Sequence, residues 1–162
     1  MNQLQNFLII ISAKYLLLVP VVVAVIFFFK KSRSEKKKIL ILAAIVFPLS
    51  YILAKILAHF YYDPRPFVFG RFAPLIPHAA DNGFPSDHTL LAVAIAVVIF
   101  HFSRRSGLFL FLVAILIGAA RVFAGVHHFT DIAGSLAIVL VVYLFTTKLL
   151  LEPVWRRIRK TV

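Results

Sequence analysis

The fold is indicated first by residues 84–100, which read FPSDHTLLAVAIAVVIF. Ser86 and Asp87 follow a proline, which is typical of the start of a helix. The stretch from Leu90 to Phe100 then carries no charge. We therefore predict a membrane-spanning helix over about residues 86–103, with its polar first turn at one face of the bilayer.

Further apolar segments lie on both sides of this one. A membrane helix needs about 20 predominantly apolar residues, and segments of this kind are expected at about 7–29, 39–60, 108–123 and 130–151. The early residues 1–12 are equally compatible with a helix that lies in the membrane interface. Residues 61–85 contain five of the eight prolines and are predicted to form a loop. The expected fold class is an all-α integral membrane helical bundle, with residues 1–162 as a single domain.

Composition supports a membrane protein and excludes several kinds of site. Hydrophobic residues make up 62% of the sequence and its mean hydropathy is +0.96, whereas a soluble domain is about 45–50% apolar. The chain has no cysteine. Disulfides, cysteine–zinc sites and a cysteine nucleophile are therefore excluded.

The basic residues that give the chain its net charge of +12 gather mainly outside the apolar segments. Basic residues gather at 30–38, 104–105 and 156–160, which fall between or after the apolar segments. This is the positive-inside pattern, so these runs are expected in the cytoplasm. The segments 61–85 and 124–130 would then share the extracytoplasmic side of a cell membrane. For the same reason we expect membrane lipids, and no nucleic acid, as partners of the basic residues.

A first polar cluster contains Arg65, which stands between two prolines, and Lys55 upstream of it. The planar guanidinium of arginine matches the oxygens of a phosphate group, and the prolines stiffen the backbone beside it. Both residues could instead serve the membrane surface, with Lys55 extending towards water and Arg65 contacting a lipid headgroup.

A second cluster contains Ser86, Asp87 and His88 at the start of the predicted helix. Free backbone amides at a helix N-terminus bind anions, and the helix dipole favours this. His88, in the first turn, could donate a proton to a leaving oxygen. The alternative is simple helix capping, with His88 as a packed neighbour.

A third cluster contains Arg121, His127 and Asp131. Residues four apart on a helix lie on one face, so a carboxylate at 131 could orient the imidazole at 127 and leave its other nitrogen as a nucleophile. Arg121 would neutralise the anion under attack. A buried His–Asp pair that only holds two helices together is the alternative.

Taken together, the three clusters favour phosphoryl transfer. That reaction needs a nucleophile, an acid for the leaving group, and fixed positive charge around three oxygens. A metal held by His88, His127, Asp87 and Asp131 is the competing interpretation, but the arginines disfavour a cation in the same pocket. We expect neither a metal nor another cofactor.

These motifs resemble those of the type 2 phosphatidic acid phosphatase superfamily, whose active site is shared with vanadium haloperoxidases. The family pattern is Lys-x6-Arg-Pro, Pro-Ser-Gly-His and Ser-Arg-x5-His-x3-Asp. The corresponding segments here are Arg65-Pro66, Pro85-Ser86-Asp87-His88 and Ala120-Arg121-x5-His127-x3-Asp131. The match extends over roughly residues 50–140.

The resemblance implies a role for each matching residue. His127 would form a phosphohistidine, Asp131 would orient it, and His88 would be the general acid. The groups implied to bind the phosphoryl oxygens are Arg65, Arg121 and Ser86.

The chain departs from the pattern at three positions. Ala58 stands where the family has lysine, and Lys55 lies about one helical turn earlier, roughly 4.5 Å of rise away. Asp87 replaces glycine, which adds negative charge next to the phosphate site but suits the helix dipole. Ala120 replaces serine and removes one hydroxyl.

Within the superfamily, the sequences FPSDHT and PRPF look most like the undecaprenyl-diphosphate phosphatases linked to bacitracin resistance. This implies a haloperoxidase-like core of five to six transmembrane helices in a bacterial plasma membrane. The expected reaction is hydrolysis of undecaprenyl diphosphate, a lipid phosphate substrate, to its monophosphate. Phosphatidylglycerol phosphate, phosphatidic acid or a lipid A phosphate are alternative substrates, and a small transporter or an inactive scaffold is the alternative outside this class.

Overall fold

A computed structural model describes residues 2–151 of the chain, and the basic run predicted at 156–160 lies outside the described residues. The regular elements, in chain order, are α1 (Gln3–Tyr15), α2 (Leu18–Phe29), α3 (Arg33–Phe60), α4 (Pro66–Gly70), α5 (Asp87–Phe102), α6 (Arg104–Phe123), α7 (Phe129–Phe145) and the π-helical η1 (Thr146–Leu151). These elements confirm the predicted all-α fold class.

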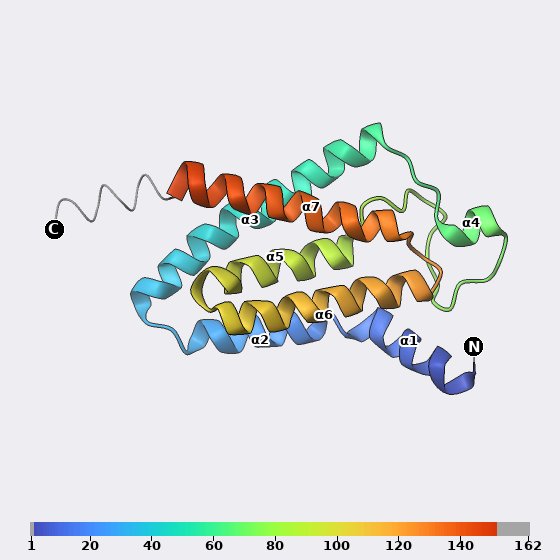
Figure 1. Cartoon of the computed structure of the whole chain (residues 1–162), viewed down its shortest axis with the longest axis horizontal. Helices are drawn as coiled ribbons and strands as arrows, with labels where there is room; N and C mark the ends of the chain where they lie inside the picture. Colours follow the sequence, from blue (N-terminus) through green and yellow to red (C-terminus); the bar gives the residue numbers. More distant parts are fainter. Residues whose placement is uncertain (1, 152–162) are drawn as a thin grey trace.

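Helix α5 lies at the centre of the bundle, with α2, α3, α6 and α7 packed around it (Figure 1). Its 16 residues include ten that are buried, among them every residue from Ala92 to Ile99. A helix that is apolar on all sides belongs in a protein interior. The stretch that first indicated the fold is therefore its core.

The outer surface of the bundle is apolar, as expected for contact with lipid. On α6 the exposed large hydrophobic side chains are Leu108, Phe109, Leu112, Ile115, Leu116 and Phe123. Within the described residues, three helices are long and apolar enough to cross a membrane, over Arg33–Phe60, Arg104–Phe123 and Phe129–Leu149. A fourth span results if α1 and α2 count as one, whereas α5 is a shorter apolar helix. The five apolar segments predicted from sequence thus all appear as helices, but not all have the length of a full span.

The first predicted span, residues 7–29, differs most from expectation. It is two helices that meet at Leu16 and Leu17 with a bend of 43°. Helix α1 leaves the line of α2 and packs against α6, where Ala13 is buried. The broken geometry places a backbone carbonyl of α1 beside the polar end of α6.

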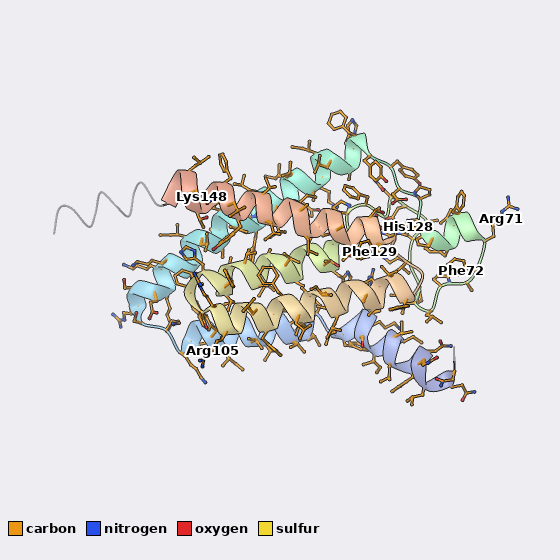
Figure 2. The ribbon with its side chains drawn as sticks, in the orientation of Figure 1. Arg71, Phe72, Arg105, His128, Phe129 and Lys148 are labelled. Atoms are coloured by element: carbon orange, nitrogen blue, oxygen red, sulfur yellow. The ribbon has the colours of Figure 1, made fainter. Side chains whose placement is uncertain are left out.

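The two ends of the bundle differ in chemistry. The basic residues that begin α3 and α6 lie at one end, whereas α4 and the long loops before α5 lie at the other (Figure 1). Arg105 and Arg71 mark these opposite ends in Figure 2. The motif residues all lie towards the end that carries α4.

Candidate active site

A polar pocket of about 300 Å³ lies at the α4 end of the bundle. It is lined by Lys55, Ala58, Arg65, His78, Asp81, Asn82, Phe84, Pro85, Asp87, His88, Arg121 and His127. Three segments that are distant in sequence meet here: the end of α3 with the following loop, the start of α5, and the connection between α6 and α7. The pocket therefore brings together residues from all three sequence clusters.

His127 and Asp131 meet at the beginning of α7. The Nδ1 atom of His127 lies 3.1 Å from Oδ2 of Asp131, and the same oxygen accepts the backbone N–H of His128 at 2.8 Å. His128 is the N-cap residue, so His127 precedes the helix. The predicted contact is present, but it arises from a carboxylate that caps its own helix rather than from two residues on one helical face.

The environment of His127 keeps its imidazole neutral. Burial lowers the pKa of His127 below its usual value, and the charges of Arg65 and Arg121 lower it further, against the hydrogen bond to Asp131. Since Nδ1 faces a carboxylate, we assign the proton to Nδ1. The Nε2 atom, 3.3 Å from Nη1 of Arg65, then carries the free lone pair. This is the form in which histidine acts as a nucleophile.

Arg65 is held rigidly although it belongs to a loop. Its Nε donates to Oδ1 of Asp81 at 2.7 Å and its Nη1 to the carbonyl of Val126 at 2.8 Å. Partial burial would raise the pKa of Asp81, but the hydrogen bond and charge of Arg65 outweigh it and hold that pKa below its usual range. The buried guanidinium is thereby fixed beside Nε2 of His127.

Arg121 contributes a second cation from the last turn of α6. The side chain is buried, and its Nη1 donates to the carbonyl of Ala13 in α1 at 3.4 Å. Its Nε has no hydrogen-bond partner among the described residues. Because buried polar groups are almost always paired, this unused donor next to the pocket is consistent with a site for an anion.

The start of α5 contributes residues of different accessibility. His88 and Asp87 line the pocket, whereas Ser86 is fully buried and its hydroxyl accepts a hydrogen bond from Thr89 at 3.2 Å. Ser86 is the N-cap residue by position, but its side chain makes no capping bond. A contact between its hydroxyl and a phosphoryl oxygen stays a prediction.

Lys55 lies at the rim of the pocket. Its Nζ is 3.6 Å from Oδ1 of Asp87, and both side chains are more than half exposed. The same ammonium lies 4.9 Å from the centre of the Tyr51 ring. Lys55 thus reaches the site, where it pairs with the residue that replaces the family glycine.

Sequence reasoning did not identify the residues that hold the loops together. Asn82 donates to the carbonyls of Ala58 and Tyr61 and accepts the N–H groups of Asp63 and Phe84, each at 3.0 Å. It therefore joins the end of α3 to the segment before α5. An Asp-Asn-Gly turn sequence at 81–83 was the available signal.

Ser135 was also missed, because a single serine in an apolar helix is unremarkable. Its hydroxyl lies 2.9 Å from the carbonyl of Ser86 and 2.8 Å from that of Asp131. It thus links α7 to the residue that begins α5. His78, the third unpredicted residue, lines the pocket beside His127.

A possible metal-binding group differs from the one weighed from sequence. In the described part of the chain, ligand atoms of Asp63, His128 and Asp131 lie within 4.8 Å of one another. They already interact directly, since Nδ1 of His128 is 3.2 Å from Oδ1 of Asp63 and its backbone N–H donates to Asp131. Figure 2 shows His128 at the start of α7. These contacts give the three residues a structural role in joining the loop to α7.

Comparison with known proteins gives consistent matches. The PAP2 superfamily matches the chain over residues 38–155. Undecaprenyl-diphosphatase BcrC of Bacillus subtilis (strain 168) is 42% identical over 82 residues, which cover 51% of this chain and 42% of that protein. Bacitracin transport permease protein BcrC of Bacillus licheniformis is 36% identical over 94 residues, covering 57% of this chain and 46% of that protein.

Similarity also extends to a solved structure. The crystal structure of Aquifex aeolicus LpxE is similar with a TM-score of 0.70 and 29% identity, covering 91% of this chain and 88% of that one. The chain spans about half the length of the curated relatives it matches.

Proposed function

This chain belongs to the PAP2 superfamily, as its motifs predicted, and from that premise we propose that it is a metal-independent lipid phosphatase that hydrolyses undecaprenyl diphosphate to undecaprenyl phosphate and phosphate. The observation that carries the proposal is the position of the His127 ring, with Nε2 3.3 Å from the guanidinium of Arg65 and Nδ1 3.1 Å from the carboxylate of Asp131. The name and 42% identity of the B. subtilis relative favour this substrate.

The first step transfers the terminal phosphoryl group to the protein. Nε2 of His127 attacks the terminal phosphorus in line, an N–P bond forms, and the bond to the bridging oxygen breaks. His88 gives a proton to the departing oxygen of the lipid monophosphate. Asp131 stabilises the positive charge that develops on the imidazole, and Arg65 and Arg121 stabilise charge on the phosphoryl oxygens.

The second step restores the histidine. A water molecule attacks the phosphorus of the phosphohistidine, the N–P bond breaks, and inorganic phosphate leaves. His88, which lost its proton in the first step, accepts one from this water, so the cycle returns both histidines to their starting forms.

An apolar groove offers a place for the lipid tail. It has a volume of about 340 Å³ and lies between α3 and α5, lined by Phe47, Ser50, Tyr51, Asp87, Leu90, Leu91 and Ala94. Asp87 also lines the polar pocket. The groove and the pocket therefore adjoin, and the proposal places the diphosphate in the pocket and the first isoprene units in the groove.

The same proposal locates the site on the extracytoplasmic face of the cell membrane. It is supported by the separation of the basic residues of α3 and α6 from the pocket end of the bundle. Positive charge is retained on the cytoplasmic side of membrane proteins.

The test is phosphate release from undecaprenyl diphosphate in detergent, with the wild type and His127→Ala compared in excess chelator. Release by the wild type alone supports the proposal. Preference for phosphatidic acid, phosphatidylglycerol phosphate or a lipid A phosphate in the same assay rejects the substrate but keeps the chemistry. Solute flux in vesicles without release from any of these lipids would instead identify a transporter.

A further inference from the structure

The two arginines of the pocket are only partly available to a substrate. Arg65 uses Nε on Asp81 and Nη1 on the carbonyl of Val126, and Arg121 uses Nη1 on the carbonyl of Ala13. A phosphoryl group in transfer spreads negative charge over three oxygens, each able to accept hydrogen bonds. A further donor near Nε2 of His127 would complete this set.

His78 lies next to the nucleophile. It belongs to the loop between α4 and α5, lines the polar pocket, and is half-buried. Its ring centre is 6.1 Å from that of His127, with the ring planes at 77°. The two rings therefore approach each other edge to face, and both line the pocket in which a phosphoryl group would bind.

The surroundings of His78 leave one of its nitrogens for a ligand. Nδ1 lies 3.4 Å from the carbonyl of Ala79 and 4.0 Å from Oδ1 of Asp81. That side of the ring therefore faces acceptors, and Nδ1 carries the proton in the neutral form. Nε2 is the nitrogen left for a bound group.

We propose that His78 is a phosphate-binding residue, whose protonated Nε2 donates a hydrogen bond to a phosphoryl oxygen of the substrate during transfer to His127. This inference rests on the proposed function and adds a ligand to it. On the α3 side, the pocket is lined by the small, uncharged Ala58. The additional phosphate ligand would therefore come from His78 in the loop.

The charge balance fits this role. Burial, together with the charges of Arg65 and Arg121, lowers the pKa of His78 below its usual value when the pocket is empty. A phosphoryl dianion reverses the sign of the local field, because an opposite charge favours the protonated imidazole. His78 would therefore take up its second proton together with the substrate, and the empty pocket would not hold three cations at once.

Lys55 is less suited to this position. Its Nζ pairs with Asp87 at 3.6 Å and lies over the Tyr51 ring, a residue that lines the apolar groove. Its charge is therefore at the junction of groove and pocket, whereas His78 borders the nucleophile itself.

The test is a rescue experiment. His78→Ala should lower kcat/KM for undecaprenyl diphosphate by roughly tenfold to a hundredfold, the range for loss of one hydrogen bond to a charged group. Ala58→Lys, which introduces a cation into the same pocket from α3, should restore at least part of this loss in the His78→Ala background. Ala58→Met in that background is the matched control, similar in length but uncharged, and should restore nothing.

Binding of inorganic phosphate, followed by calorimetry, separates this inference from the proposed function. The wild type should bind phosphate more tightly than His78→Ala, and Ala58→Lys should recover the affinity. Unchanged turnover and phosphate affinity in His78→Ala would overturn the role of His78 while His127-dependent release still upheld the phosphatase. Equal rescue by lysine and methionine would also overturn it, because the effect would then be one of packing.

Discussion

Nδ1 of His127 lies 3.1 Å from Oδ2 of Asp131, and the two side chains are 3% and 0% exposed. The same carboxylate oxygen accepts the backbone N–H of His128. The start of α7 therefore fixes the carboxylate, and the carboxylate fixes the imidazole. Helix capping and orientation of the nucleophile are performed by one group.

Asp131→Asn should keep the shape of this arrangement and lose its chemistry. An amide can donate to Nδ1 and so favour the wrong tautomer, and it cannot stabilise a positive imidazole. We expect kcat for phosphate release to fall by roughly 10²- to 10⁴-fold, as in other His–Asp pairs. Phe129→Ala, which removes a side chain that is 77% exposed at the same helix start, is the control and should retain wild-type turnover. Near-normal activity in Asp131→Asn would reduce the pair to a structural contact.

The acid limb of the pH–rate profile should lie below the pKa of free histidine, about 6.5. Attack requires neutral His127, and burial lowers the pKa of this residue in the folded protein. The ring thus stays neutral as pH falls through 6.5, and turnover is lost only as pH passes the lowered pKa. Single-turnover kinetics on undecaprenyl diphosphate would give the limb directly.

The lowered pKa of His127 also determines how this residue's contribution to stability changes with pH. A lowered pKa means that the unfolded state binds a proton more readily than the folded state, so the contribution of His127 to the free energy of unfolding decreases as pH falls below about 6.5.

Replacement of Asp131 by Asn removes a group that raises the pKa of His127 and should move the acid limb of the pH–rate profile to still lower pH. A limb above 6.5 in the wild type would contradict the assignment.

Excess chelator should leave turnover unchanged. The proposed steps use Arg65, Arg121 and His88 where a metal enzyme would use a cation, and Asp63 and His128 already pair with each other at 3.2 Å. The measurement is the rate of phosphate release after dialysis against EDTA, followed by addition of Mg²⁺, Mn²⁺ or Zn²⁺. Loss on dialysis with recovery by one metal would identify the group around Asp63 as a functional metal site.

The motif residues could be predicted because each is a polar group in an apolar setting. His88, Arg121 and His127 stand near the ends of apolar segments, Arg65 stands between two prolines, and the structure places all four around one pocket. The lengths of the apolar segments also indicated the approximate positions of the long helices. They did not reveal the bend at Leu16 and Leu17, although Pro20 lies four residues after Leu16 and cannot donate the helical hydrogen bond to its carbonyl.

Residues of the long loop were harder to identify. Polar side chains are ordinary in loops, so His78 gave no distinct signal, and the sequence Asp-Asn-Gly at 81–83 indicated only a turn. The contacts that these residues make depend on the path of the backbone. The same limit applies to His127 and Asp131, whose spacing predicted the contact but not the helix cap that creates it. Spacing identifies neighbours within an element, whereas the connections between elements depend on tertiary packing.

Membrane orientation can be measured because the chain has no cysteine. Single-cysteine variants Ala73→Cys, in the exposed loop after α4, and Arg105→Cys, at the exposed start of α6, place one thiol at each end of the bundle. An impermeant maleimide should label position 73 in intact cells and position 105 only after permeabilisation. The reverse pattern would place the pocket in the cytoplasm.

Asn82 should determine whether the pocket assembles. Its amide nitrogen donates to the carbonyls of Ala58 and Tyr61, and its oxygen accepts from Asp63 and Phe84. Asn82→Ala removes all four hydrogen bonds, each of which contributes about 0.5–1.5 kcal/mol to stability. Asn82→Asp keeps the two acceptor contacts and loses the two donor contacts to the end of α3.

We therefore expect thermal unfolding temperatures in the order wild type, Asn82→Asp, Asn82→Ala, with turnover falling in the same order. The reason is that Asn82 joins α3 to the segment that leads into Asp87 and His88, so its loss separates the two walls of the pocket. If both variants unfolded like the wild type yet lost turnover equally, Asn82 would act on the substrate itself rather than through the loop that it holds.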